Sequence, residues 1–226
     1  MPLTTLDRRA ARIVGALYLA TFATSFPGLA LRTELLHGGG PVALAPWAAL
    51  LEIVLALSCV GTAVALLPIA WRRAPALGIG FVSSRLLEAS AILVGALALL
   101  SVATVRGEAG SGGSGGEIEG ALIALHDWSF LLGPGLFPAV NALLLGALLH
   151  RYRLVPRVLP LLAFIGAPLL IASFLGTLFG ALDQVSPLSG LAALPIAAWE
   201  LGLGLWLLIR GVRTPAGAPD SPPEHP

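Results

Sequence analysis

The amino-acid sequence predicts an all-α fold: a polytopic bundle of six transmembrane helices with both termini in the cytoplasm. The first observation is composition, because 57% of the 226 residues are apolar and only 11% are charged, whereas soluble domains carry about 25% charged residues. The second is a set of six apolar runs long enough to cross a bilayer. The third is a strong arginine bias between the two sets of loops. Together they indicate a multi-pass membrane protein.

Each predicted span is an apolar run bounded by charges, glycines or prolines, since crossing a ~30 Å hydrocarbon layer takes about 20 mostly apolar helical residues. The expected spans are 13–31, 47–71, 77–105, 121–149, 155–180 and 188–209. Some exceed the minimum length, which fits tilt or kinks rather than extra spans. The prolines expected at such kinks are Pro27, Pro134, Pro138 and Pro168.

The first three spans are separated by polar or basic breaks. Span 13–31 follows a basic start, so a cleaved signal peptide is the alternative interpretation, although the run is long and lacks a clean A-x-A site. Span 47–71 ends at Arg72 and Arg73, and span 77–105 ends at Arg106. These breaks predict short loops.

The last three spans follow a Gly/Ser-rich loop, 106–120, which we expect to be a flexible linker between two groups of three helices. Span 155–180 carries a G-x-x-x-G pattern at Gly176 and Gly180, which predicts close helix packing. Span 188–209 is followed by a Pro-rich segment, 212–226, expected to be a disordered tail. The predicted organisation is one six-helix membrane domain, 1–211, with this tail.

Orientation follows from the arginines, because positive residues are retained on the cytoplasmic side. All 13 basic residues are arginine, which with the richness in Ala, Gly and Leu suggests a GC-rich bacterial genome. One side has only Arg32 and Arg106. The other collects Arg8, Arg9, Arg12, Arg72, Arg73, Arg151, Arg153, Arg157, Arg210 and Arg213. The sequence therefore predicts a bacterial cytoplasmic-membrane protein with cytoplasmic termini.

Several function classes find no support in the sequence. The net charge of +1 does not suggest a nucleic-acid partner, and the single cysteine, Cys59, excludes an intrachain disulfide. A G-x-S-x-G pattern at 112–116 and an HGGG pattern at 37–40 resemble esterase motifs, but the esterase serine needs a strand-turn-helix setting and this one lies in the linker. No cofactor or metal site is predicted. The oligomeric state is left open.

The candidate binding site is a group of polar residues within or at the ends of the spans. An ionised side chain near the bilayer centre costs about 2.5 to 3.5 kcal/mol on insertion scales, so each must face protein, a partner or water. The candidates are Glu52, Arg85, Glu88, His126, Asp127, Asn141 and Glu200. No catalytic residue is assigned among them.

Spacing places some of these residues together. Arg85 and Glu88 are three apart on one helix and are expected to pair, and Asp127 and Asn141, fourteen apart, share a face. Glu88 and Glu200 are expected near the midplane. Arg85 is counted as the only permanent cation against four carboxylates. The excess acids must then be protonated, line a wet cavity or bind a cation.

Five stretches of the chain resemble the bacterial membrane family called domain of unknown function 4386. They are LLEIVLAL at 50–57, FVSSRLLEA at 81–89, HDWSFLLG at 126–133, LVPRVL at 154–159 and LPIAAWELGLGLWLLIRG at 194–211. The resemblance implies an acid in the second helix, an R-x-x-E in the third, a D-W in the fourth and a glutamate before the last apolar run. His126 departs from the arginine that often precedes D-W. The family carries no established activity.

Three functions remain open at this point. The first is a small transporter or binding protein for a small solute, a cation or a proton. The second is an intramembrane acid/base or lipid-modifying enzyme using Asp127, Glu52 or Glu88. The third is a structural or regulatory subunit whose ion pairs only fix helix register. The lipid bilayer is a partner in all three.

Overall fold

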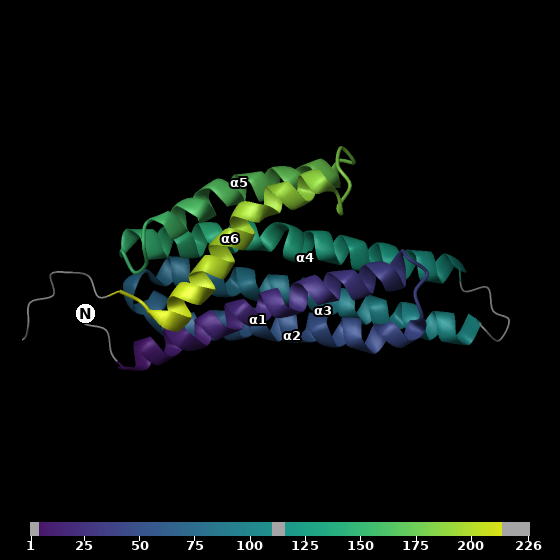
Figure 1. Cartoon of the computed structure of the whole chain (residues 1–226), viewed down its shortest axis with the longest axis horizontal. Coiled ribbons are helices and arrows are strands. Elements are labelled where there is room, and N and C mark those ends of the chain that lie inside the picture. Colours follow the sequence, from purple (N-terminus) through teal and green to yellow (C-terminus); the bar gives the residue numbers. More distant parts are fainter. Residues whose placement is uncertain (1–4, 110–115, 214–226) are drawn as a thin grey trace, which may run out of the picture.

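Six long helices follow the six predicted spans (Figure 1). The computed structural model describes residues 5–109 and 116–213, and within these ranges all six helices are long and apolar enough to cross a membrane, with no strand. The helices are α1 (Thr5–Leu36), α2 (Ala45–Arg73), α3 (Pro75–Ala109), α4 (Gly116–Arg151), α5 (Val158–Leu178) and α6 (Pro187–Ile209), with a short 3-10 helix η1 (Val42–Leu44) before α2. The predicted fold class is confirmed.

Most of the helices extend beyond the apolar runs that predicted them. Helix α1 continues through Pro27 and α5 through Pro168, so these prolines do not end their helices. The largest difference is at the predicted linker 106–120. Helix α3 reaches Ala109, α4 begins at Gly116, and Arg106 Nε donates to Glu119 Oε1 at 2.8 Å. The ends of the predicted linker are therefore helical, and 110–115, with most of the G-x-S-x-G pattern, lies outside the described residues.

The six helices form a closed ring in which each packs against its neighbours in sequence and α6 returns to pack on α1. Helices α3 and α4 pack along each other, so the predicted division into two groups of three is not visible as a gap. The first and last described helical ends, of α1 and α6, lie at the same end of the bundle (Figure 1). We call this the terminal end and the opposite one the outer end.

The ten arginines expected in the cytoplasm lie at or next to the terminal end. At this end α1 begins, α6 ends, and the α2–α3 and α4–α5 loops connect their helices. Arg72 pairs there with Asp7 of α1, and the Tyr152 hydroxyl donates to the carbonyl of Arg73. Val212 is buried and the Arg213 N–H donates to Leu154 O at 2.8 Å, so the predicted tail is packed at its first two residues. Residues 214–226 lie outside the described residues. The cytoplasmic assignment of this end stays a prediction.

Helices α1 and α6 cross in backbone contact near the terminal end. A Cβ added at Gly15 would lie 2.5 Å from Leu208 N and 2.6 Å from Gly204 O, and a Cβ at Gly204 would lie 3.0 Å from the Tyr18 Cβ. Only glycine allows this approach. Beyond the crossing, α6 diverges from α1 and runs beside α5 toward the outer end (Figure 1). We call the region between the outer halves of α1 and α6, where residues of both helices line cavities, the wedge.

The expectation of close helix packing at Gly176 and Gly180 was wrong. Gly180 lies after α5 with φ of +73°, and its N–H bonds to Thr177 O at 3.0 Å while the Ala181 N–H bonds to Gly176 O at 2.7 Å. This pattern is a Schellman motif, which ends a helix with a glycine in the left-handed conformation. The nearest atoms to a Cβ at Gly176 belong to Leu182 of the following loop, not to another helix.

The largest apolar core fills the half of the bundle nearer the terminal end, where Tyr18, Phe81, Trp199, Leu203 and Leu207 are fully or almost fully buried. A smaller cluster at the outer end has its buried residues on α1, α2 and α3, such as Leu35, Ala48 and Leu99, and Leu122 and Ile123 of α4 pack against it. Many large apolar side chains point outward, which is the pattern expected for a lipid-facing surface.

Candidate functional site

The seven candidate residues form two clusters, not one. The inner cluster contains Arg85, Glu88, Asn141 and Glu200. The outer cluster contains Glu52, His126 and Asp127, and it also includes Arg32 and His37, which were not among the candidates. Asp127 and Asn141 lie on one helix but take part in different clusters. The structure thus separates the predicted group by depth along the bundle.

Arg85 and Glu88 form the centre of the inner cluster, and their predicted pairing is present. Arg85 Nη1 donates to Glu88 Oε2 at 2.8 Å, and the side chains are only 2% and 5% exposed. Asn141 Nδ2 of α4 donates to the same carboxylate oxygen at 2.7 Å. Arg85 Nη1 also lies 3.5 Å from Cys59 Sγ of α2, so Cys59 contributes to packing around the guanidinium. The charge on Arg85 is balanced chiefly by Glu88.

Glu200 of α6 is held much more loosely. Its Oε1 atom lies 3.8 Å from Arg85 Nη2, beyond hydrogen-bond distance, and its side chain is 16% exposed. Arg85 Nε and Nη2 are buried and have no hydrogen-bond partner among the described residues. The guanidinium also lies over the Tyr18 ring, 5.0 Å from its centroid. The inner cluster therefore holds a carboxylate and a guanidinium edge that face each other without bonding.

The outer cluster is centred on Glu52 of α2. Its Oε1 atom lies 3.0 Å from His126 Nε2 and 3.7 Å from Arg32 Nη1. Asp127 lies at the surface of this cluster, with Oδ1 3.6 Å from His126 Nδ1 and 3.3 Å from His37 Nε2. Helices α1, α2 and α4 are thereby tied together by polar contacts toward their outer ends.

Gly95 of α3 makes room for the outer cluster. A Cβ at this position would lie 2.9 Å from Ser129 Oγ, 3.5 Å from His126 Cδ2 and 3.8 Å from Glu52 Oε2. Any larger residue would press on the buried histidine and glutamate. Gly95 therefore has a local packing role that its surroundings in the sequence did not indicate.

Counting Arg85 as the only permanent cation among the acids was wrong. Arg32 was assigned to an outer loop because the first apolar run ends at residue 31, but α1 continues to Leu36 and the Arg32 side chain turns inward. Arg32 is 6% exposed and its guanidinium carbon lies 3.1 Å from the centroid of the Phe130 ring. An arginine directly after an apolar run, at the depth of Glu52 on the next helix, was the signal available in the sequence.

Three cavities lie in series along the wedge, and we call them the inner, middle and outer cavities. Their volumes are about 210, 260 and 430 Å³. The inner and middle cavities share Pro134, Leu170 and Ala193 in their walls. The middle and outer cavities share Arg32, Phe130, Gln184 and Val185. The three cavities therefore lie one after another between the inner cluster and the outer end of the bundle.

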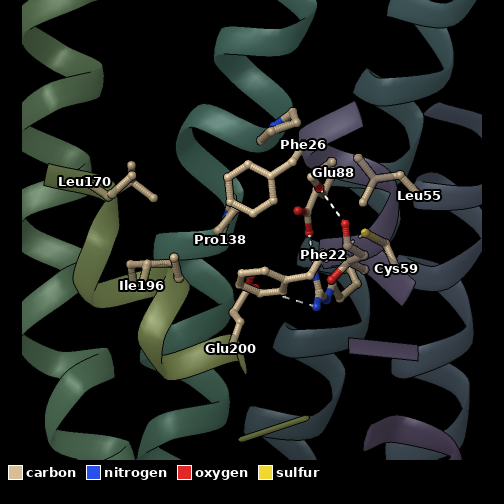
Figure 2. A pocket seen from close by; sticks show the side chains of 15 residues that line it. Phe22, Phe26, Leu55, Cys59, Glu88, Pro138, Leu170, Ile196 and Glu200 are labelled. Atoms are coloured by element: carbon tan, nitrogen blue, oxygen red, sulfur yellow. Dashed lines mark hydrogen bonds and ion pairs between the residues drawn. The ribbon is translucent and has the colours of Figure 1, made fainter. Parts of the chain in front are cut away.

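The inner cavity is mostly apolar with charged groups on one wall (Figure 2). Arg85, Glu88 and Glu200 supply the charges. The remaining wall includes Phe22, Phe26, Leu55, Pro138, Leu170 and Ile196. Figure 2 shows these apolar side chains arranged around the space between Glu88 on α3 and Glu200 on α6. Such a pocket, apolar with a few converging polar groups, is typical of small-molecule binding.

Neither cluster offers an evident metal centre. Within 5–109 and 116–213, no group of three or more His, Cys, Asp and Glu side chains is placed to hold a metal ion. What the inner cluster offers is a hydrogen-bond donor edge, from Arg85, and an acceptor, Glu200, on one cavity wall. These groups can bind and orient a polar group or exchange a proton with it.

The comparisons with known proteins address family membership. No curated protein and no solved structure matches the chain. A family model described as a domain of unknown function (DUF4386) matches residues 13–211, a range that takes in most of α1 and all of the other five helices. The chain therefore belongs to the family described as domain of unknown function DUF4386.

Proposed function

We propose that this membrane protein binds a small solute in the inner cavity and passes it between that cavity and the outer end of the bundle, as a small transporter or solute-binding protein. One observation carries the proposal. Glu200 lies on the wall of a cavity within the bundle, and among the described residues no hydrogen bond to its carboxylate is present. A carboxylate held this way inside a membrane bundle is expected to serve a ligand or a proton.

A purely structural role accounts for part of the inner cluster only. Glu88 accepts bonds from Arg85 and Asn141 and joins α3 to α4, as a register-fixing polar group does. Glu200 makes no comparable contact between helices, since its carboxylate lies 3.8 Å from Arg85 Nη2. If the network existed only for folding, an apolar residue at position 200 would leave Arg85 and Glu88 balanced as a neutral pair, at lower cost.

The cavities support access from the outer end. The middle cavity lies between Leu29 of α1, Phe174 of α5 and Ala193 of α6, which places it in the wedge. Phe26 lines the inner cavity and is 63% exposed, so we propose a second opening of that cavity at the side of the bundle. We infer that a solute enters from the outer end or from the outer part of the bilayer.

Cysteine accessibility tests the proposal without knowledge of the solute. In a Cys59→Ala background, which removes the only cysteine, Ala197→Cys would place a thiol on the inner cavity. Leu87→Cys is the matched control, since Leu87 is next to Glu88 in α3 but 57% exposed on the outside of the bundle. Both are treated with a charged, membrane-impermeant thiol reagent applied from the outer side.

We expect the cysteine at position 197 to react and the cysteine at position 87 to stay unmodified, because charged reagents reach thiols only through water. If neither cysteine reacts with the thiol reagent, the inner cavity does not contain water, and the proposed function is contradicted. Blocking the middle cavity, by Gly190→Trp on its α6 wall, should slow the reaction at position 197.

A further inference from the structure

We propose that the solute of the inner cavity is a small zwitterion with an apolar body, of the class of apolar α-amino acids. This inference rests on the proposed function, because it names the substrate class of the same cavity. It starts from two charged groups of opposite sign that share one wall. They are Glu200 and the Nε and Nη2 edge of Arg85.

The Arg85 edge calls for a hydrogen-bond acceptor. The side chain is 2% exposed, and Nε and Nη2 have no hydrogen-bond partner within the described residues, while Nη1 is already bonded to Glu88. A buried N–H without an acceptor is costly, and its pairing with a carboxylate is among the stronger hydrogen bonds. A planar carboxylate on the solute fits this edge.

Glu200 calls for a donor. Its nearest charge is Arg85 Nη2 at 3.8 Å, too far for a hydrogen bond, and Arg85 is balanced mainly by Glu88. A carboxylate left over in a low-dielectric setting favours a positive group beside it. An ammonium group supplies both the charge and three N–H donors.

Neither charge alone serves both groups. A solute with only an ammonium group would neutralise Glu200 but leave the Arg85 edge without an acceptor and repel the guanidinium. A solute with only a carboxylate would add a third negative charge beside Glu88 and Glu200. An α-amino acid carries its ammonium and carboxylate groups on the same carbon atom, so it can meet two groups whose nearest atoms lie 3.8 Å apart at once.

The remaining wall residues and the volume of the cavity determine the polarity and the size of the uncharged part of the solute. Phe22, Leu170 and Ile196 give an apolar lining, so the body is a hydrocarbon side chain. A volume of about 210 Å³ admits only a small molecule, below the range of 300 to 1,000 Å³ typical of pockets for drug-sized ligands. Leucine has both features.

The test uses three molecules of nearly the same shape. Binding of radiolabelled L-leucine to the purified full-length protein is measured in detergent, with 3-methylbutylamine and 4-methylpentanoate as competitors. The amine lacks the carboxylate and the acid lacks the ammonium. Each loses one charged hydrogen bond, so each is expected to bind at least about tenfold more weakly than leucine.

Glu200→Gln is expected to weaken leucine binding at least about tenfold, because the neutral amide cannot balance the ammonium. Glu117→Gln, at an exposed position near the start of α4, is the matched control and should bind leucine as the unaltered protein does. Unchanged binding in Glu200→Gln overturns the assignment of the ammonium site.

The other outcomes are equally decisive. If the amine competes as well as leucine, the site takes cations; if the acid does, it takes anions; either result overturns the zwitterion assignment, as does the absence of binding by all three molecules. Labelling of the cysteine at position 197 then separates the two proposals. If the cysteine at position 197 is labelled but none of the three molecules binds, the zwitterion assignment is wrong and the proposed function remains. If that cysteine is not labelled, both proposals are wrong.

Discussion

At the scale of single residues, Glu88 and Glu200 have the same side chain and different surroundings. Glu88 is 4% exposed and receives bonds from Arg85 and Asn141. Glu200 has an ion pair with Arg85 at 3.8 Å and faces the inner cavity. We therefore assign stability to the first and solute contact to the second.

This division predicts opposite effects of the same substitution. Glu88→Gln should destabilise the protein by about 3 to 5 kcal/mol, because it breaks a buried ion pair and leaves Arg85 with only the Glu200 carboxylate, 3.8 Å away, as its counter-charge. Glu200→Gln should leave stability unchanged or raise it, because it removes a like charge near Glu88. Thermal unfolding of both variants in detergent measures the difference. Equal loss of stability in the two would show that Glu200 is a structural residue as well.

Arg32 provides a second prediction at this scale. Arg32→Gln should destabilise the outer cluster by a few kcal/mol, because Glu52, 3% exposed, would keep only His126 as a partner. Arg9→Gln, an exposed arginine of the same helix, is the control. Melting temperatures that do not differ between these two variants would mean that Glu52 does not depend on Arg32.

At the scale of the helices, α1 has two different environments along its length. Near the terminal end it touches α6 backbone to backbone at Gly15 and Gly204. Further along, its side chains from Thr21 to Arg32 line the wedge and the three cavities. The crossing therefore acts as the fixed point from which α6 diverges and the wedge opens.

The crossing predicts a strong position dependence for glycine-to-alanine changes in α1. Gly15→Ala should cost about 1 to 3 kcal/mol or more, because the new Cβ would lie 2.5 Å from a backbone nitrogen that cannot move without shifting α6. Gly28→Ala is the control, since its Cβ would meet only the Leu51 side chain at an ordinary 3.6 Å. The melting temperature of Gly15→Ala should be lower than that of Gly28→Ala. Similar melting temperatures for the two variants would contradict the close crossing of α1 and α6.

At the scale of the whole molecule, the closed ring brings α6 back onto α1 near the terminal end, and the two helices diverge toward the outer end (Figure 1). The even number of helices puts the ends of α1 and α6 together, with ten arginines at or near that end. Because positive residues are retained in the cytoplasm, the cavities are expected to open toward the outside.

Fusion proteins test that orientation. Alkaline phosphatase fused after Asp183, in the α5–α6 loop, should be active because this enzyme needs the oxidising outer compartment. The same enzyme fused after Arg153, in the α4–α5 loop, should be inactive. The reverse pattern would place the outer cavity on the cytoplasmic side and would invert the direction of access proposed above.

The sequence by itself determined the number, order and approximate extent of the helices, because length and apolarity are properties of contiguous residues. It also determined the Arg85–Glu88 pair, since a spacing of three places both on one helix face. Linker 106–120 was predicted too long because Gly and Ser suggest a loop even where helices extend into it.

The tertiary structure alone decided how the polar residues divide. Which side chains meet across helices depends on rotation, tilt and crossing distance, and no spacing along one chain encodes these. Arg32 joined Glu52 and His126 because α1 continues past its apolar run and turns that side chain inward. Glu200 came to lie beside Arg85 on the wall of the inner cavity because two glycines let α6 cross α1 and then diverge. The sequence located the charges, and the packing of the helices decided which of them were left without partners.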